Sequence, residues 1–400
     1  MRTRWVPVAA AMFCCGWGGN QFTPLLVMYK HAGYSALTVD VLLGAYVLGL
    51  VPGLLLSGGL SGRYGRRPVM LLGTAASLLG SLLLALGADG LGWLVAGRLV
   101  SGVAVGAAMA VGSTWVKELT DGGPVGAADL GTRRAALWLT LGLGTGSGVA
   151  GALAQWGPWP MALPYLAHAA LAAVSLAALP ASPETRRGGA FRPGPRRART
   201  GTPGDARGAR HPRFRRVILP MAPWIFGSLG VAYATMPQLV GDRLGSWSLA
   251  YSTLLTLCAL GAGVGIQPVA KRLDRATSAR AVVVALAVVC AGLLCAASAA
   301  ALGSPWAALA TALVLGAGYG IAVVSGLLEL QRLARPTELA ELTGVYYALA
   351  YLGFLLPTAL TALSDVAGYP TLLASLAVVA LAGAGVVLRY SRAHLPAAGL

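Results

Sequence analysis

Twelve long apolar segments constrain this chain of 400 residues more than any other feature of its sequence. Each has about 20 residues, the length of α-helix needed to cross a bilayer core of about 30 Å. Hydrophobic residues make up 56% of the chain and the mean hydropathy is +0.71, above the apolar usage of about 45–50% in soluble domains. The sequence therefore predicts an all-α, polytopic membrane protein with 12 transmembrane helices. The predicted segments are Trp5–Val27, Val39–Leu60, Val69–Gly87, Leu91–Val116, Ala135–Gln155, Met161–Leu179, Val217–Val240, Ser248–Ala270, Ala281–Leu302, Pro305–Leu328, Leu339–Leu363 and Pro370–Leu388.

The basic residues gather on one side of these segments. The chain has 30 Lys and Arg against 13 Asp and Glu, and nearly all the cations lie in loops on the side that carries both termini. The exceptions are Lys30 and Arg243 in opposite loops and Arg98 inside a segment. Because cytoplasmic loops carry an excess of Lys and Arg, we expect a multi-pass protein of the cell membrane with both termini cytoplasmic. The excess of Arg over Lys and the abundance of Ala and Gly favour a bacterial source.

A polar segment divides the predicted helices into two sets of six. Residues 181–216 are rich in Arg, Gly and Pro and have few aliphatic side chains, so they cannot bury enough apolar area to order themselves. We interpret them as a cytoplasmic linker between an N-terminal half, residues 1–180, and a C-terminal half, residues 217–400. The linker arginines are either solvated or in contact with anionic lipid headgroups.

The two halves repeat short patterns at corresponding places. RYGRR begins at Arg63 after the second predicted helix, and RLDR begins at Arg272 after the eighth. Internal repeats of this kind are typical of secondary transporters, whose substrate site lies near the membrane midplane between the repeats. The fourth and tenth predicted helices also carry paired glycines four residues apart, namely Gly102 and Gly106, and Gly316 and Gly320.

The loop after the second predicted helix has the sequence GGLSGRYGRRP. With twelve helices in two sixes and a basic central loop, this chain resembles the major facilitator superfamily, in which the same loop carries G-x-L-x-D-R-x-G-R-R. Gly62 stands where that family has Asp. The resemblance covers essentially the whole chain and implies alternating access, with this loop acting as an inner gate. The matching residues are Gly58, Leu60, Arg63, Gly65, Arg66 and Arg67.

Two interpretations of this loop remain open. In the first, glycines allow a tight turn and arginines hold the helix ends at the cytoplasmic face. In the second, Arg63 or Arg67 pairs with Glu338 or Glu341 at the start of the eleventh predicted helix, which replaces the missing Asp. Acids in a first helical turn also suit the helix dipole, so their position does not choose between the two.

Polar side chains inside the predicted helices are the candidates for a substrate site. They are costly in lipid and tend to face the protein interior. The resemblance implies that helices 1, 4, 7 and 10 line the cavity. The alternative is that such groups only join helices to one another. The candidates are Asn20 and Gln21 in the first helix, Tyr233 and Gln238 in the seventh, and Tyr346, Tyr347 and Tyr351 in the eleventh.

Arg98 is a candidate for both substrate binding and coupling. It lies in GRLVSG, which resembles a conserved arginine motif of the family's fourth helix. At about 1.5 Å per residue, a position seven residues into the helix is about 10 Å deep. An arginine at this depth is a functional candidate by default, and extension of its side chain to the outer interface is the alternative.

Proton coupling needs a titratable group that meets each side of the membrane in turn. The candidates are Asp40, Arg98, His168, Glu118 and Glu329. His168 titrates near neutral pH when unperturbed, but a helix-packing role suits it as well. Asp40 begins a helix, where the dipole favours an acid, and it could pair with Arg98. Glu118 and Glu329 end the fourth and tenth helices, where interfacial acids are also common.

The fifth predicted helix contains LGLGTGSGVAGA, which places Gly144, Gly148 and Ala152 on one face and allows close helix packing. It also resembles a glycine-rich motif of antiporters, with Val149 in place of the characteristic proline. We therefore expect proton-coupled efflux of a small organic molecule. The alternatives are proton-coupled uptake of a metabolite and a membrane sensor that does not transport.

Other protein classes have less support. The acids and histidines are scattered without a convergent catalytic set, so we expect no enzyme, although a membrane enzyme stays an alternative. No metal-ligand spacing occurs, so no metal or cofactor is expected. Arginines spread over every inner loop without interleaved aromatics do not predict nucleic-acid binding. The expected partners are a small-molecule substrate, protons and membrane lipid, and the protein is expected to be a monomer.

Overall fold

The computed structural model describes residues 4–120, 127–186, 207–334, 339–393 and 395. Contacts within the chain divide it into two units, which are described separately. The first comprises Met1–Tyr34 and Val41–Arg196, and the second comprises Ser35–Asp40 and Arg197–Leu400. The short segment Ser35–Asp40 therefore packs with the second unit, although the helix that begins there continues in the first.

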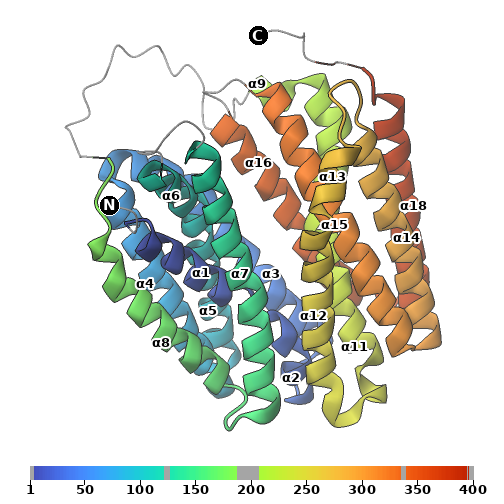
Figure 1. The fold of residues 1–400 in the computed structure, drawn as a ribbon. Helices are drawn as coiled ribbons and strands as arrows, with labels where there is room; N and C mark the ends of the chain where they lie inside the picture. Colours follow the sequence, from blue (N-terminus) through green and yellow to red (C-terminus); the bar gives the residue numbers. More distant parts are fainter. Residues whose placement is uncertain (1–3, 121–126, 187–206, 335–338, 394, 396–400) are drawn as a thin grey trace. The chain divides into compact units, whose positions relative to one another are not determined.

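The first unit is a bundle of helices (Figure 1). In chain order they are α1 (Val6–Asn20), α2 (Leu26–His31), α3 (Ala36–Tyr64), α4 (Arg66–Ala85), α5 (Leu91–Ala107), a π-helical segment (Ala108–Gly112), α6 (Ser113–Thr120), α7 (Ala127–Trp156) and α8 (Leu163–Ala178).

The second unit is also helical. Its elements are α9 (Arg207–Arg210), a π-helical segment (Phe214–Ile218), α10 (Leu219–Gly230), a second π-helical segment (Val231–Thr235), α11 (Met236–Val240), α12 (Ser248–Gly265), α13 (Gln267–Leu273), α14 (Arg280–Leu302), α15 (Pro305–Leu333), α16 (Leu339–Tyr351), α17 (Leu356–Leu363) and α18 (Tyr369–Arg389).

These elements confirm the all-α membrane fold. Over the described residues, eleven helices are long and apolar enough to span a membrane, and the only β-type contact is the isolated bridge between Arg275 and Ser278. The predicted first span, Trp5–Val27, is broken into α1, a 3-10 turn (Thr23–Leu25) and α2. Proline lacks an N–H and its ring clashes with the carbonyl four residues before it, so Pro24 explains the break after Asn20. The freed Asn20 carbonyl accepts a hydrogen bond from Ser147 Oγ at 3.1 Å.

Glycines allow α1 and α7 to approach closely in the first unit. A Cβ atom on Gly142 would lie 2.1 Å from the Phe13 carbonyl oxygen, and one on Gly146 would lie 2.6 Å from Trp17 Cα. The predicted packing face with Gly144 is wrong, because a Cβ at Gly144 would meet no atom within 4 Å. The helix is rotated so that the other pair of glycines, also four residues apart, meets α1.

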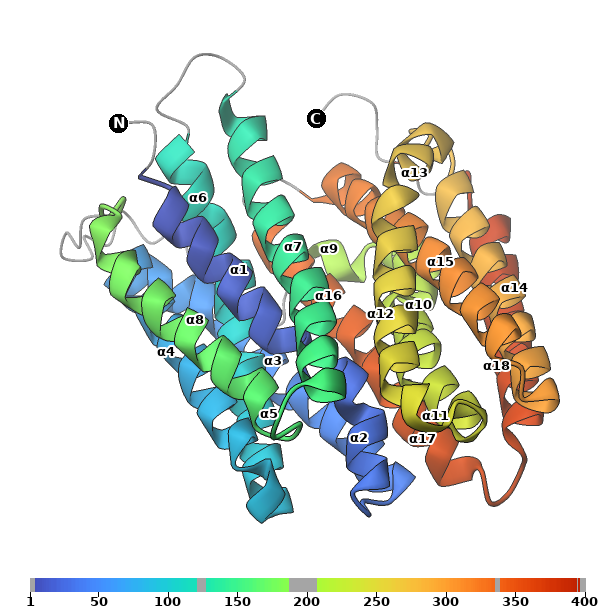
Figure 2. The same cartoon turned by 60° about the horizontal axis from the view of Figure 1, so that its bottom comes forward.

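The paired glycines of the repeat serve the same purpose in both units. A Cβ on Gly102 of α5 would lie 2.2 Å from the Tyr46 carbonyl oxygen of α3. A Cβ on Gly316 of α15 would lie 2.2 Å from the Ala259 carbonyl oxygen of α12. In the second unit, α14 lies beside both α15 and α18 in two views (Figures 1 and 2).

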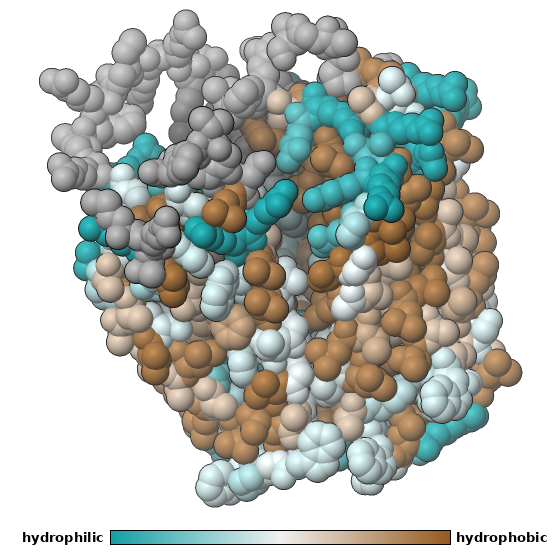
Figure 3. Space-filling view, viewed as in Figure 1, coloured by the Kyte–Doolittle hydropathy of each residue, from teal (hydrophilic) through white to brown (hydrophobic). Residues whose placement is uncertain are grey.

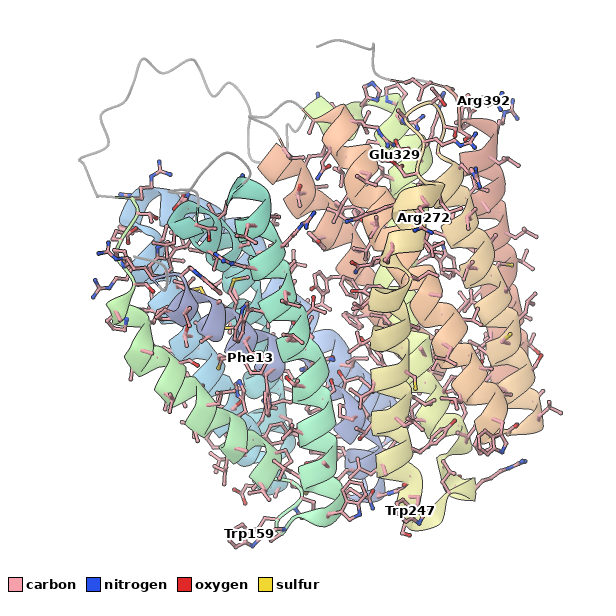
Figure 4. All side chains as sticks on the ribbon, viewed as in Figure 1. Phe13, Trp159, Trp247, Arg272, Glu329 and Arg392 are labelled. Carbon is pink, nitrogen blue, oxygen red and sulfur yellow. The ribbon has the colours of Figure 1, made fainter. Side chains whose placement is uncertain are left out.

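The second unit separates apolar sides from a charged end. Figure 3 shows apolar residues over the sides of its helices and hydrophilic residues gathered at one end. Arg272, Glu329 and Arg392 lie at that end, and Trp247 lies at the opposite end (Figure 4). An apolar belt with charges beyond it is the surface expected of a protein surrounded by lipid.

Candidate functional site

Arg98 of α5 is buried in the first unit, with 1% of its surface exposed, so its side chain does not extend to an interface. Its Nε donates to the Leu42 carbonyl oxygen at 3.1 Å, and Nη2 donates to that of Leu43 at 3.5 Å. The guanidinium lies 4.6 Å from the centre of the Phe22 ring and 4.5 Å from that of Tyr46. A buried cation is costly unless it is hydrogen-bonded, and carbonyl oxygens and ring faces supply the negative potential here.

Gln21 and His168 belong to one polar network that joins α1, α4 and α8. Gln21 Nε2 donates to Ser81 Oγ at 2.8 Å, and Ser81 Oγ lies 2.6 Å from His168 Nδ1. His168 Nε2 lies 2.9 Å from the Cys14 carbonyl oxygen. A carbonyl oxygen only accepts, so Nε2 carries a proton, and the Ser81 hydroxyl satisfies Nδ1 of a neutral ring. This arrangement matches the helix-packing interpretation of His168.

One atom of this network lacks a partner. Gln21 Oε1 is buried and accepts no hydrogen bond from any part of the chain that the structure describes. Gln21 therefore joins helices through its amide nitrogen, while its amide oxygen can still accept a hydrogen bond.

Asn20 joins α1 to α7. Its Nδ2 donates to Ser147 Oγ at 2.6 Å and to the Leu143 carbonyl oxygen at 3.1 Å. Its Oδ1 accepts from Thr23 Oγ1 at 2.9 Å. Both donors and the amide oxygen are thus engaged, which matches the alternative that this residue only joins helices.

Asp40 is buried, with 1% exposed, and packs within the second unit. Its Oδ1 accepts from Gln238 Nε2 at 2.8 Å and its Oδ2 accepts from Thr361 Oγ1 at 2.6 Å. Thr358 Oγ1 donates to the Asp40 carbonyl oxygen at 3.0 Å. The structure thus brings together two predicted site residues, Asp40 and Gln238. The two threonines of α17 were not predicted, and their only signal was a spacing of three residues in an apolar helix.

Aromatic side chains from α10, the π-helical segment Val231–Thr235, α15, α16 and the turn after α16 form a continuous cluster in the second unit. The rings of Phe226 and Tyr351 stack with centres 4.1 Å apart and planes 14° apart. Phe354 lies 5.0 Å from Phe226, and Tyr319 lies 5.8 Å from it. We call this group the aromatic cluster; its members are Phe226, Tyr233, Tyr319, Tyr346, Tyr347, Tyr351 and Phe354.

The predicted tyrosines have different places in the aromatic cluster. Tyr346 is fully buried, and its hydroxyl donates to the Val323 carbonyl oxygen at 3.3 Å, which ties α16 to α15. Tyr347 is partly exposed. Tyr233 lies in the π-helical segment Val231–Thr235, 6.3 Å from Phe354. π-Helical segments inside α-helices often occur at functional sites.

Glu118 is held in a charged cluster at the start of α4. Arg66 Nη2 lies 2.9 Å from Glu118 Oε1, and Arg66 Nη1 donates to Ser61 Oγ at 2.6 Å. Glu184 accepts from the backbone N–H groups of Arg66 at 3.0 Å and Arg67 at 2.8 Å. A carboxylate at a helix N-terminus satisfies free N–H groups and is favoured by the dipole. Glu184 was missed because its loop partners lie more than a hundred residues away.

The predicted gating loop is built around Gly65. Its φ of +103° belongs to a region that favours glycine, and a Cβ there would lie 2.7 Å from Glu184 Oε2. At Gly62, the position of the family's Asp, a Cβ would lie 3.6 Å from Arg186 Nη1. Glu338 lies outside the described residues, as does the side chain of Glu341. Their pairing with Arg63 or Arg67 therefore stays a prediction.

Glu329 occupies the corresponding place in the second unit. It forms a two-pronged ion pair with Arg213, with Nε to Oε2 at 2.7 Å and Nη2 to Oε1 at 2.8 Å. The two side chains are 1% and 0% exposed. Arg213 Nη1 also donates to the Ser391 carbonyl oxygen at 3.2 Å. Arg332 contacts Glu329 at 3.4 Å and pairs with Asp274.

Part of the predicted linker lies in described structure. Residues 207–210 and 213–216, at the end of the predicted linker, belong to described structure in which Arg213 is buried.

In the part of the chain with described side chains, no group of three or more His, Cys, Asp or Glu is placed to hold a metal ion.

Comparison with known proteins agrees with this architecture. Residues 8–357 match the family model of the Major Facilitator Superfamily. A crystal structure of a POT family transporter in complex with 5-aminolevulinic acid is similar, with a TM-score of 0.77, 13% identity and coverage of 97% of this chain and 96% of that chain. The nucleoside transporter NupG is similar with a TM-score of 0.70, 12% identity and coverage of 97% and 99%. No curated protein matches the sequence. The family match spans most of the chain, which belongs to the Major Facilitator Superfamily.

Proposed function

We propose that this protein is a secondary transporter that couples proton movement to the export of a small organic molecule by alternating access. Family membership and the transporter fold support the general class. The observation that carries the proton coupling is the buried carboxylate of Asp40, held by an amide and a hydroxyl near the start of the candidate membrane span Ala36–Tyr64. Ionisable groups in such segments are functional candidates by default.

The other coupling candidates have structural roles that account for them. Glu118 and Glu329 each form an ion pair with an arginine, which accounts for both acids as structural residues. His168 is engaged at both ring nitrogens by Ser81 and Cys14. Asp40 accepts hydrogen bonds from Gln238 and Thr361, and each of these donors also lies within hydrogen-bond distance of a second oxygen, that of the Ala234 carbonyl for Gln238 and that of the Tyr369 hydroxyl for Thr361.

The substrate proposed is amphipathic, with an aromatic or cationic part. Flat rings bind aromatic groups by stacking and bind cations through their faces. The aromatic cluster supplies seven such rings in the second unit, and Tyr319 and Tyr347 among them are partly exposed. This chemistry is general, so it supports a class of substrate and no single compound.

Uptake of a metabolite is the second candidate. One observation favours it: the glycine-rich motif of antiporters is incomplete here, with an exposed Val149 at the position of its proline. Gly142 and Gly146 of the same run pack on α1, which accounts for these two glycines without an antiport role.

The proposed location is the cytoplasmic membrane of a bacterium, with both termini in the cytoplasm. In the second unit the arginine-rich end carries Arg272 and Arg392, and Trp247 lies at the opposite end (Figure 4). Cytoplasmic ends are rich in Lys and Arg, and Trp is enriched at both membrane interfaces. This distribution supports the orientation expected from the loops.

The test uses inverted membrane vesicles that contain the protein and an acidic interior. A panel of lipophilic aromatic and cationic compounds is added, and the internal pH is followed with a fluorescent dye. Export by proton exchange predicts that a substrate collapses the gradient, and that Asp40→Asn abolishes the response in a correctly folded protein. Arg243→Ala, at an exposed loop residue, should respond like the unaltered protein.

Each outcome separates the candidates. A compound that is taken up with protons into right-side-out vesicles, and that leaves the inverted vesicles unchanged, would replace export by uptake. A compound transported at equal rates with and without the gradient would contradict proton coupling in either direction.

A further inference from the structure

An apolar groove runs along the surface of the first unit between α3, α4 and α5. Its volume of about 590 Å³ lies within the range of about 300–1,000 Å³ that is common for small-molecule sites. Several of its residues are exposed: Tyr64 by 57% and Leu72 by 72%. The groove is lined by Leu60, Tyr64, Pro68, Leu72, Val103 and Ala107, among others.

One end of this groove meets a cluster of cations. Tyr64 and Pro68 line the groove at the turn between α3 and α4, which also carries Arg63 and Arg67. The Arg63 guanidinium lies 5.2 Å from the centre of the Tyr64 ring, so the charge lies over a wall of the groove. An acyl chain in the groove would therefore bring its headgroup to these arginines.

The nearby carboxylates are already engaged. Glu118 is bound by Arg66 and by Thr185. Glu184 accepts from the backbone N–H groups of Arg66 and Arg67. Among the side chains that the structure describes, none forms an ion pair with the guanidinium of Arg63 or Arg67.

We propose that this groove binds one anionic phospholipid of the surrounding membrane. An acyl chain fills the apolar groove, and the phosphate is bound by Arg63 and Arg67. Guanidinium groups bind phosphate through paired hydrogen bonds, and basic clusters next to membrane helices attract anionic headgroups.

Because position 62 has glycine instead of an acid, the groove should prefer one type of lipid headgroup over another. A zwitterionic lipid also presents a cationic group, which an acidic side chain near the phosphate site would attract. Gly62 supplies none, and its nearest side chain is the cation of Arg186, 3.6 Å from where a Cβ would lie. The local charge thus favours a lipid with a net negative headgroup over one of zero net charge.

The test is native mass spectrometry of the full-length protein in detergent, titrated with phosphatidylglycerol or phosphatidylcholine of identical acyl chains. The first phosphatidylglycerol molecule should bind with an affinity at least about tenfold higher than that of the first phosphatidylcholine molecule, because two arginines contribute to its binding. Arg63→Gln combined with Arg67→Gln should reduce this preference to about twofold or less. Arg63→Lys combined with Arg67→Lys should keep much of it.

Matched variants separate this site from general attraction to a basic protein. Arg272→Gln with Arg275→Gln changes the corresponding exposed arginines of the second unit and should leave the preference intact. Val103→Trp fills the groove and should weaken the binding of both lipids. Val264→Trp changes a similarly exposed valine of α12 and should weaken the binding of neither lipid.

Two results would overturn the proposal. One is equal affinity for the two lipids in the unaltered protein. The other is an equal loss of preference in the Arg63, Arg67 variant and in the Arg272, Arg275 control. Elution as a single folded species in size-exclusion chromatography is required of every variant. Where the glutamine pair does not fold, loss of the preference in the lysine pair would also contradict the proposal, because lysine keeps the charge that attracts the phosphate.

Discussion

At the scale of single residues, the buried charges of the two units differ in how they are satisfied. Arg98 is held by backbone carbonyl oxygens and ring faces, Glu329 by a fully buried arginine, and Glu118 by an arginine that solvent partly reaches. Breaking a buried ion pair leaves an uncompensated charge, whereas an exposed pair contributes little. Equivalent acids of the repeat should therefore respond differently to the same substitution.

The first prediction concerns this pair of acids. Glu329→Gln should destabilise the protein by about 3–5 kcal/mol, because Arg213 stays buried without its carboxylate. Glu118→Gln should cost about 1 kcal/mol or less, because the Glu118 side chain is 33% exposed. Thermal unfolding in detergent, followed by tryptophan fluorescence, measures the two midpoints.

A double variant supplies the control. Arg213→Met combined with Glu329→Leu removes both charges and should recover much of the stability lost in Glu329→Gln. Equal shifts of the thermal midpoint for Glu329→Gln and Glu118→Gln would mean that the burial of an ion pair does not affect its contribution to stability.

At the scale of elements, close approach between helices depends on a few glycines. Gly142 and Gly146 of α7 meet the backbone of α1, while Gly144 on another face meets nothing within 4 Å. In lipid, helices associate through close packing of small residues because no hydrophobic effect drives them together. The sequence contains all three glycines in one run, so it predicts a small-residue helix but not its rotation.

The second prediction tests that rotation. Gly142→Ala should destabilise the first unit, because the new methyl carbon would lie 2.1 Å from the Phe13 carbonyl oxygen and force α1 and α7 apart. Gly144→Ala should be neutral or slightly stabilising, because alanine has the higher helix propensity and open space around it. The thermal midpoints of the two variants are compared, and a greater loss for Gly144→Ala would mean that the other face of α7 packs on α1.

At the scale of the whole molecule, periodicity and charge predicted the fold far better than the site. Eleven spans follow from apolar length alone. The break in the first predicted span follows from Pro24, but predicting it also requires knowing that Ser147 supplies a hydrogen-bond partner for the Asn20 carbonyl oxygen. Asp40 and Gln238 were both predicted candidates, but their contact joins positions 198 residues apart, and Glu184 reaches its partners over similar distances. Contacts between such distant positions cannot be predicted from a single sequence. Polarity inside a helix therefore identified Asn20 and Gln21 without distinguishing helix joining from substrate binding.

Asp40 is the residue proposed to carry the proton in a coupled transport cycle. The most direct measurement is transport in proteoliposomes by Asp40→Asn, assayed both as substrate exchange without a gradient and as substrate movement driven by a pH gradient. The asparagine keeps the size of the side chain and, like a protonated carboxyl group, has one acceptor oxygen and one donor group, but it cannot lose or gain the proton. Asp89→Asn, at an exposed acid of the first unit, is the matched control. Asp40→Asn should retain exchange and lose gradient-driven movement, whereas gradient-driven movement at the unaltered rate would mean that Asp40 does not carry the proton.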